Sequence, residues 1–128
     1  MKRLVVDAPV LASWFWSDGN AAHLRGEYEE GALAVLGPAQ LLDDALAAIA
    51  EPSSADAESL ARIGSELRRL GLQLQRPPIG ELARWIARGL PAHRAAYLAV
   101  ASHLDVPFAT NDAAMLSASP SARTPDRC

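Results

Sequence analysis

LVVDAP, residues 4–9, sets three apolar residues directly before an aspartate, close to the start of the chain. A short, uniformly apolar run of this kind is typical of a strand that is buried on both faces of a parallel sheet. FATND, residues 108–112, repeats the arrangement, because Asp112 follows the apolar run at residues 106–110. The two stretches predict two buried strands, each of which is followed by a carboxylate.

The chain between these strands shows mainly helical spacing. Residues 32–36, stopped by Gly37 and Pro38, predict a further strand, whereas residues 72–78 predict only a connector and residues 17–20 a break. Parallel strands need crossover connections, so this alternation predicts an α/β fold: three α/β/α layers with a short, mostly parallel central sheet. The predicted helices cover residues 10–16, residues 21–30, a segment that begins at Pro38 and reaches Ile49, residues 56–70, residues 79–90, and a segment through Tyr97 to Leu104.

The composition limits the class of protein. The chain has 128 residues, half of them apolar, which predicts one domain over residues 1–116. The Ser/Pro-rich residues 117–128 predict a flexible tail. Apolar runs are too short for a membrane span or a signal peptide, so we expect a cytoplasmic protein without membrane contact. The single cysteine, Cys128, excludes an internal disulfide and a cysteine-based zinc site.

Charge is unevenly distributed although the net charge is only −3. Residues 62–94 hold seven arginines, which predicts either a surface that binds phosphate or an acidic partner, or simply solvated helix faces. The sequence leaves both interpretations open. The arginines are Arg62, Arg68, Arg69, Arg76, Arg84, Arg88 and Arg94.

Asp7 and Asp112 are expected to lie close together in space. The carboxyl ends of parallel strands meet at one edge of a sheet, where ligands of α/β proteins bind. One aspartate after a strand is ordinary turn chemistry. Two carboxylates at the same edge repel one another and need a cation or a proton, and Mg²⁺ or Mn²⁺ suits their hard oxygens. Such a metal can activate water against a phosphodiester.

Four stretches together resemble a PIN domain, and in size and layout most closely the VapC-like toxins: LVVDAPVLASWFW, GPAQLLDDALAAIA, RAAYLAVASHLDVP and FATNDAAML. The resemblance covers residues 4–116. It implies a PIN-like three-layer fold and a Mg²⁺-dependent (or Mn²⁺-dependent) endoribonuclease. It also implies RNA as substrate, a small antitoxin protein as partner, and a homodimer.

The resemblance also implies the site residues. Asp7, Asp44 and Asp112 match acidic positions of the family, which makes them the expected catalytic residues and metal ligands. Helical periodicity does not choose between Asp43 and Asp44, because both flank the apolar stripe at similar angles. Only the family motif favours Asp44.

The sequence departs from the family pattern at several supporting positions. Arg94 stands where the family has a third aspartate, Pro9 where it has a small hydroxyl residue, and Ala47 where it often has asparagine. Arg94 is expected either to contact a substrate phosphate or to replace the metal as counter-charge. The family's last helix and edge strand are not recognisable after Leu116, so either that strand is lost or the reading frame has drifted.

Three hypotheses about function follow from these residues. The first is a metal-dependent endoribonuclease of the toxin type. The second is a catalytically inactive PIN-like protein that keeps the fold and acts by binding RNA or protein. The third is a DNA-binding helix-turn-helix module formed by the two helices around Gly89-Leu90-Pro91, which leaves both strand-plus-aspartate stretches unexplained.

Overall fold

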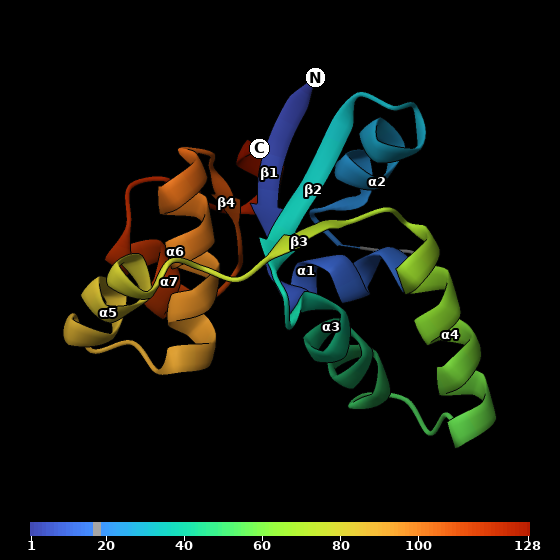
Figure 1. Cartoon of the computed structure of the whole chain (residues 1–128). Helices are drawn as coiled ribbons and strands as arrows, with labels where there is room; N and C mark the ends of the chain where they lie inside the picture. Colours follow the sequence, from blue (N-terminus) through green and yellow to red (C-terminus); the bar gives the residue numbers. More distant parts are fainter. Residues whose placement is uncertain (17–18) are drawn as a thin grey trace.

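The computed structural model describes residues 1–16 and 19–128, and a five-stranded sheet forms its centre (Figure 1). The strand order is β3-β2-β1-β4-β5, and every pair of neighbouring strands is parallel. The break predicted at residues 17–20 lies partly outside the described residues, at positions 17 and 18. The strands are β1 (Lys2–Val6), β2 (Leu33–Pro38), β3 (Gln73–Gln75), β4 (Phe108–Ala109) and β5 (Ala122–Arg123).

Helices cover both faces of this sheet, which confirms the predicted three-layer α/β/α class. Figure 1 shows α5 and α6 on one side of the sheet and α1 to α4 on the other. Among the described residues, no helix is long and apolar enough to cross a membrane. The helical elements are α1 (Ala8–Ala12), η1 (Ser13–Phe15), α2 (Ala22–Glu29), α3 (Leu41–Ala50), α4 (Ala57–Arg69), α5 (Ile79–Ala87), α6 (Ala92–Leu104), α7 (Ala113–Ala118) and η2 (Pro125–Arg127).

Helix α6 forms the centre of one layer and packs against β1, β2 and β4. Its residues 95–101 are all buried, and the alanines among them let the helix backbone approach the sheet closely. Tyr97 stacks on Phe108 of β4, with ring centroids 5.9 Å apart. A DNA-reading helix needs an exposed face to enter the major groove. The burial of α6 therefore argues against the helix-turn-helix hypothesis.

Two predicted boundaries differ from the structure around β2 and β3. Pro38, which we expected to begin a helix, is the last residue of β2, and α3 begins at Leu41. The predicted connector at residues 72–78 contains the short strand β3, whose residues pair with residues 36–38 of β2. Its sequence, Gln-Leu-Gln, has a single apolar residue, so the apolar-run criterion could not detect this edge strand.

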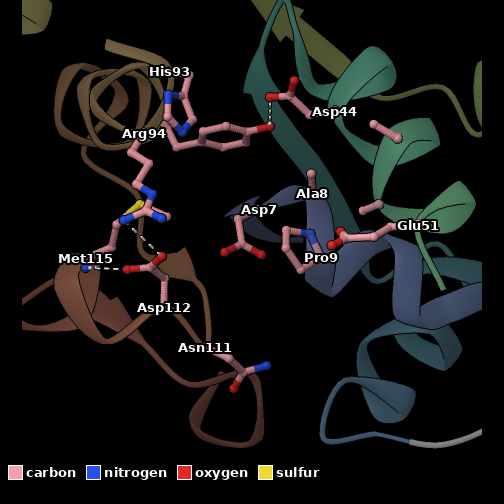
Figure 2. A pocket seen from close by; sticks show the side chains of 13 residues that line it. Asp7, Ala8, Pro9, Asp44, Glu51, His93, Arg94, Asn111, Asp112 and Met115 are labelled. Carbon is pink, nitrogen blue, oxygen red and sulfur yellow. Dashed lines mark hydrogen bonds and ion pairs between the residues drawn. The ribbon is translucent and has the colours of Figure 1, made fainter. Parts of the chain in front are cut away.

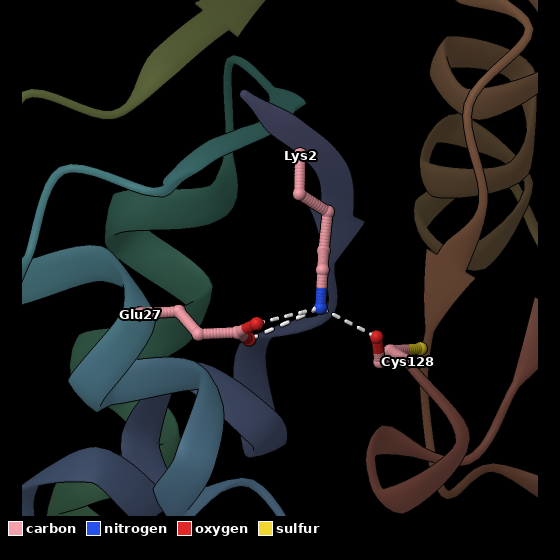
Figure 3. Close-up of polar contacts among 3 residues, drawn as sticks. All are labelled: Lys2, Glu27 and Cys128. Atoms are coloured by element: carbon pink, nitrogen blue, oxygen red, sulfur yellow. Dashed lines mark hydrogen bonds and ion pairs between the residues drawn. The ribbon is translucent and has the colours of Figure 1, made fainter.

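The C-terminal segment also differs from the prediction. Residues 117–128, expected to be a flexible tail, include β5 and η2, and the sheet thus extends beyond the predicted domain end at residue 116. Ala122 and Pro125 are buried. Lys2 lies between Glu27 and Cys128 (Figure 3). Its Nζ donates to the two carboxylate oxygens of Glu27 at 2.9 and 3.1 Å and to the carbonyl oxygen of Cys128 at 2.6 Å. The structure thus has a final strand, β5, in the segment where the sequence showed no recognisable strand.

A charge introduced at Ala122 tests whether β5 belongs to the folded core. Ala122→Asp should lower the free energy of unfolding by about 2 kcal/mol, because it buries a carboxylate that has no partner. Ser117→Asp, at an exposed position of α7, is the matched control and should change stability little. Urea denaturation measures both. Equal stability of the two variants would contradict the packing of β5.

Candidate functional site

The candidate site lies where the strand order reverses, between β1 and β4. From β1 the chain continues outward to β2 and β3, whereas β4 and β5 extend the sheet on the other side of β1. Ligands of open parallel sheets bind at such a switch point, beyond the carboxyl ends of the strands. Val6 pairs with Ala109, so Asp7 and Thr110 are the next residues at this edge. The structure thus brings Asp7 and Asp112 to the predicted location.

The carboxylate of Asp7 is buried and accepts two hydrogen bonds. It caps the N-terminus of α1, where its Oδ1 accepts from the Val10 amide at 3.1 Å. Its other oxygen accepts a hydrogen bond from the hydroxyl of Thr110. Only 3% of Asp7 is exposed. The aspartate that directly follows β1 is therefore also the N-cap of α1.

The environment of Asp7 favours its protonated form. Burial is the main cause that raises the pKa of Asp7 from 3.8 to about 6, and the negative charge of Asp112 adds to it. The hydrogen bonds from Thr110 and Val10 act in the opposite direction and lower the pKa. A carboxyl group with this pKa can change its protonation state close to neutral pH.

Asp112 is fixed from three directions. It caps α7 by accepting from the Met115 amide at 3.1 Å, and its own amide donates to the Thr110 hydroxyl at 3.0 Å. Its Oδ2 lies 3.6 Å from Nη1 of Arg94, which comes from the first turn of α6. Thr110 therefore connects the two aspartates, and Arg94 supplies the positive charge beside the second one.

Asp44, rather than Asp43, faces the site. The phenol of Tyr97 donates to Asp44 Oδ2 at 2.8 Å, across the space between α6 and α3. Burial, followed by the bond to Asp44, raises the pKa of Tyr97, so the phenol remains a donor. Asp43 is exposed on the side of α3 that faces α4. Helical periodicity did not distinguish Asp43 from Asp44. The packing of α6 distinguishes them, because Tyr97 of α6 lies on the side of α3 that carries Asp44.

These residues surround one open pocket of about 670 Å³ (Figure 2). Glu51 and His93 also line it, and the predicted site did not include them. Glu51 lies seven positions after Asp44, which places it on the same helix face, so this spacing could have identified it. The lining residues are Asp7, Ala8, Pro9, Asp44, Ala47, Ala48, Glu51, His93, Arg94, Tyr97, Asn111, Asp112 and Met115.

The pocket does not form a ready metal site. Within residues 1–16 and 19–128, no group of three or more histidine, cysteine, aspartate or glutamate side chains is arranged to hold a metal ion. Each predicted ligand instead has a protein partner: Thr110 for Asp7, Tyr97 for Asp44 and Arg94 for Asp112. The residues present therefore do not fit the Mg²⁺ or Mn²⁺ that the family resemblance implies, and the metal stays a prediction.

Comparisons with known proteins identify the fold and nothing more specific. No protein-family model matches the sequence, and no curated protein matches it significantly. Among solved structures, the crystal structure of PAE2754 from Pyrobaculum aerophilum is similar, with a TM-score of 0.71 and 23% sequence identity. The alignment covers 99% of this chain and 91% of that chain. At this identity the likeness establishes a shared fold.

The pH dependence of stability tests the environment of Asp7. The pKa of Asp7 is higher in the folded protein than in the unfolded chain, so protonation of this carboxyl group stabilises the folded state. This stabilisation is complete below about pH 4 and is lost as the pH rises through about 6. Asp7→Asn removes this ionisation and still accepts from Val10. It should therefore be more stable than the natural protein by about 3 kcal/mol at about pH 8, and this difference should shrink toward pH 4.

Urea denaturation over this pH range measures the difference. Asp43→Asn, at an exposed position, is the control and should show no such trend. A constant difference between Asp7→Asn and the natural protein would contradict the raised pKa.

Proposed function

We propose that this chain is a PIN-like protein that binds RNA through a phosphate contact at Arg94, and that its natural sequence binds RNA without metal-dependent cleavage. The resemblance of residues 4–116 to the PIN family suggests RNA as the ligand. The single observation that carries the proposal is the Arg94–Asp112 ion pair, which sets a guanidinium where the family has a carboxylate.

The position of the pocket supports a binding role. It lies beyond the carboxyl ends of β1 and β4, at the switch point of the sheet, and Asp7, Asp44 and Asp112 come to it from three separate segments. An open pocket of this size falls within the range of about 300–1,000 Å³ that is typical of small-ligand sites. It can hold part of a single RNA strand.

Arg94 is suited to a phosphate. Its side chain is 42% exposed, and among the described residues its guanidinium is paired only with one oxygen of Asp112, at 3.6 Å. A guanidinium has five N–H donors in a planar fork, so most of them remain available to a phosphate. His93 precedes it on the same wall of the pocket and adds a second possible donor.

The same ion pair weakens the case for catalysis. A divalent ion bound by Asp112 would lie beside the positive charge of Arg94, and the two cations would repel one another. The ion would also compete with Thr110 and Tyr97 for the oxygens of Asp7 and Asp44. These contacts weigh against metal-dependent hydrolysis in the natural sequence.

Metal-dependent endoribonuclease activity is the second candidate. One specific observation favours it: Asp7, Asp44 and Asp112 line the same pocket, as the family resemblance implies. A metal that displaced Arg94 from Asp112 would bring this donor set into use. The small antitoxin protein and the homodimer are implied by the resemblance alone and stay predictions.

Replacing Arg94 tests the phosphate contact. Arg94→Gln should weaken binding of single-stranded RNA about tenfold, because a charge-assisted hydrogen bond is lost, and should reduce the slope of log affinity against log salt by about one. Fluorescence anisotropy across a salt series measures both quantities. Arg62→Gln removes the same charge from exposed α4, outside the pocket, and should leave binding unchanged. Equal binding by the two variants would overturn the proposal.

Titration with Mn²⁺ separates the two candidates. Isothermal titration calorimetry should show no saturable binding to the natural protein, because its carboxylates are already engaged. The double variant Arg94→Asp, Pro9→Ser restores two family residues and should gain Mn²⁺ binding and RNA cleavage. If the natural protein binds Mn²⁺ and cleaves RNA, and Asp7→Asn abolishes both, the nuclease candidate replaces the binding one.

A further inference from the structure

The pocket has two walls of different character. Figure 2 shows His93, Arg94, Asp112 and Met115 on one side, and Ala8, Pro9, Asp44 and Glu51 on the other. The first wall comes from α6 and α7 and holds the guanidinium. The second comes from α1 and α3 and is largely apolar, with a carboxylate at its far end.

The second wall has an apolar part. Pro9, Ala47 and Ala48 all line the pocket, and none of them carries a side-chain hydrogen-bonding group. The resemblance to the PIN family implies a small hydroxyl residue at position 9 and often an asparagine at position 47, whereas this chain has Pro9 and Ala47. These two residues give the wall opposite Arg94 an apolar surface.

Glu51 ends this apolar surface. It follows Ala47 and Ala48 by one helical turn, and its carboxylate extends from the C-terminal end of α3 toward Pro9 (Figure 2). Within residues 1–16 and 19–128 no hydrogen bond or ion pair engages this carboxylate. It therefore presents two acceptor oxygens to whatever lies on Pro9 and the two alanines.

A carboxylate in this position discriminates among the four bases. Only guanine has two adjacent donors, N1–H and the N2 amino group, on its Watson–Crick edge. Adenine and cytosine place a ring acceptor beside their amino group, and uracil flanks its single donor with two carbonyl oxygens. Each of these three would bring a lone pair against the carboxylate. In a duplex the guanine edge is already paired, so only an unpaired nucleotide can offer it.

We propose that Glu51 is a specificity-determining residue that selects an unpaired guanine in single-stranded RNA, with the base on Pro9, Ala47 and Ala48 and the phosphate on Arg94. This inference rests on the proposed RNA-binding function. It adds to that function the base that is preferred, guanine, and the residue that recognises it, Glu51.

Short oligouridines that carry one central guanosine, adenosine or cytidine test the proposal by fluorescence anisotropy. The natural protein should bind the guanosine oligomer roughly tenfold more tightly than the adenosine oligomer, as two hydrogen bonds to a base edge allow. Glu51→Gln should abolish the guanosine preference, because a glutamine amide presents one donor and one acceptor and can pair with the Watson–Crick edge of any of the four bases. Asp43→Asn removes a charge from the same helix outside the pocket and should keep the guanosine preference.

The outcomes separate this inference from the proposed function. Binding that needs Arg94 but is indifferent to the base, or a guanosine preference that survives in Glu51→Gln, would overturn the role of Glu51 alone. Absence of any Arg94-dependent binding would overturn both. Thermal unfolding of Glu51→Gln and Asp43→Asn should match the natural protein, because both positions are exposed, and this confirms that lost preference reflects recognition.

Discussion

The site depends on the parallel pairing of β1 with β4, and above all on the hydroxyl of Thr110. Thr110 and Asp7 are 103 positions apart in the sequence, yet the hydroxyl donates to the Asp7 carboxylate and accepts from the amide of Asp112. Thr110 is fully buried, so this link is shielded from water. It sets the relative position of two carboxylates whose negative charges repel one another.

Because Thr110 holds Asp7 and Asp112 near one another, their negative charges must be compensated within the pocket. Asp7 is buried beside Asp112, and the protein limits the repulsion through the raised pKa of Asp7 and through Arg94. A metal ion could serve the same purpose in a site built from carboxylates alone. Here the guanidinium is part of the chain. The guanidinium of Arg94 beside Asp112 thus influences both the charge of the pocket and the chemistry that it can support.

The two walls of the pocket are held by different packing contacts. Helix α6 is fixed by its buried residues against β1, β2 and β4, which positions Arg94 and the phenol of Tyr97. Helix α3 packs against α1, which positions Asp44 and Glu51. The Tyr97–Asp44 hydrogen bond joins the walls. The pocket between the walls is open to solvent.

The sequence by itself determined the local features: the strands around Leu4 and Phe108, the aspartate after each, the helix through Tyr97 and the α/β class. These depend on residues within a few positions of one another, through apolar runs, helical spacing and helix caps. Only the tertiary structure decided that Asp44 faces the pocket, that Arg94 pairs with Asp112, and that β3 and β5 complete the sheet. The short edge strands β3 and β5 contain few apolar residues. The pairing of side chains across the pocket depends on which helix packs on the other side of it. Both are set by contacts between distant segments, which local sequence patterns do not encode.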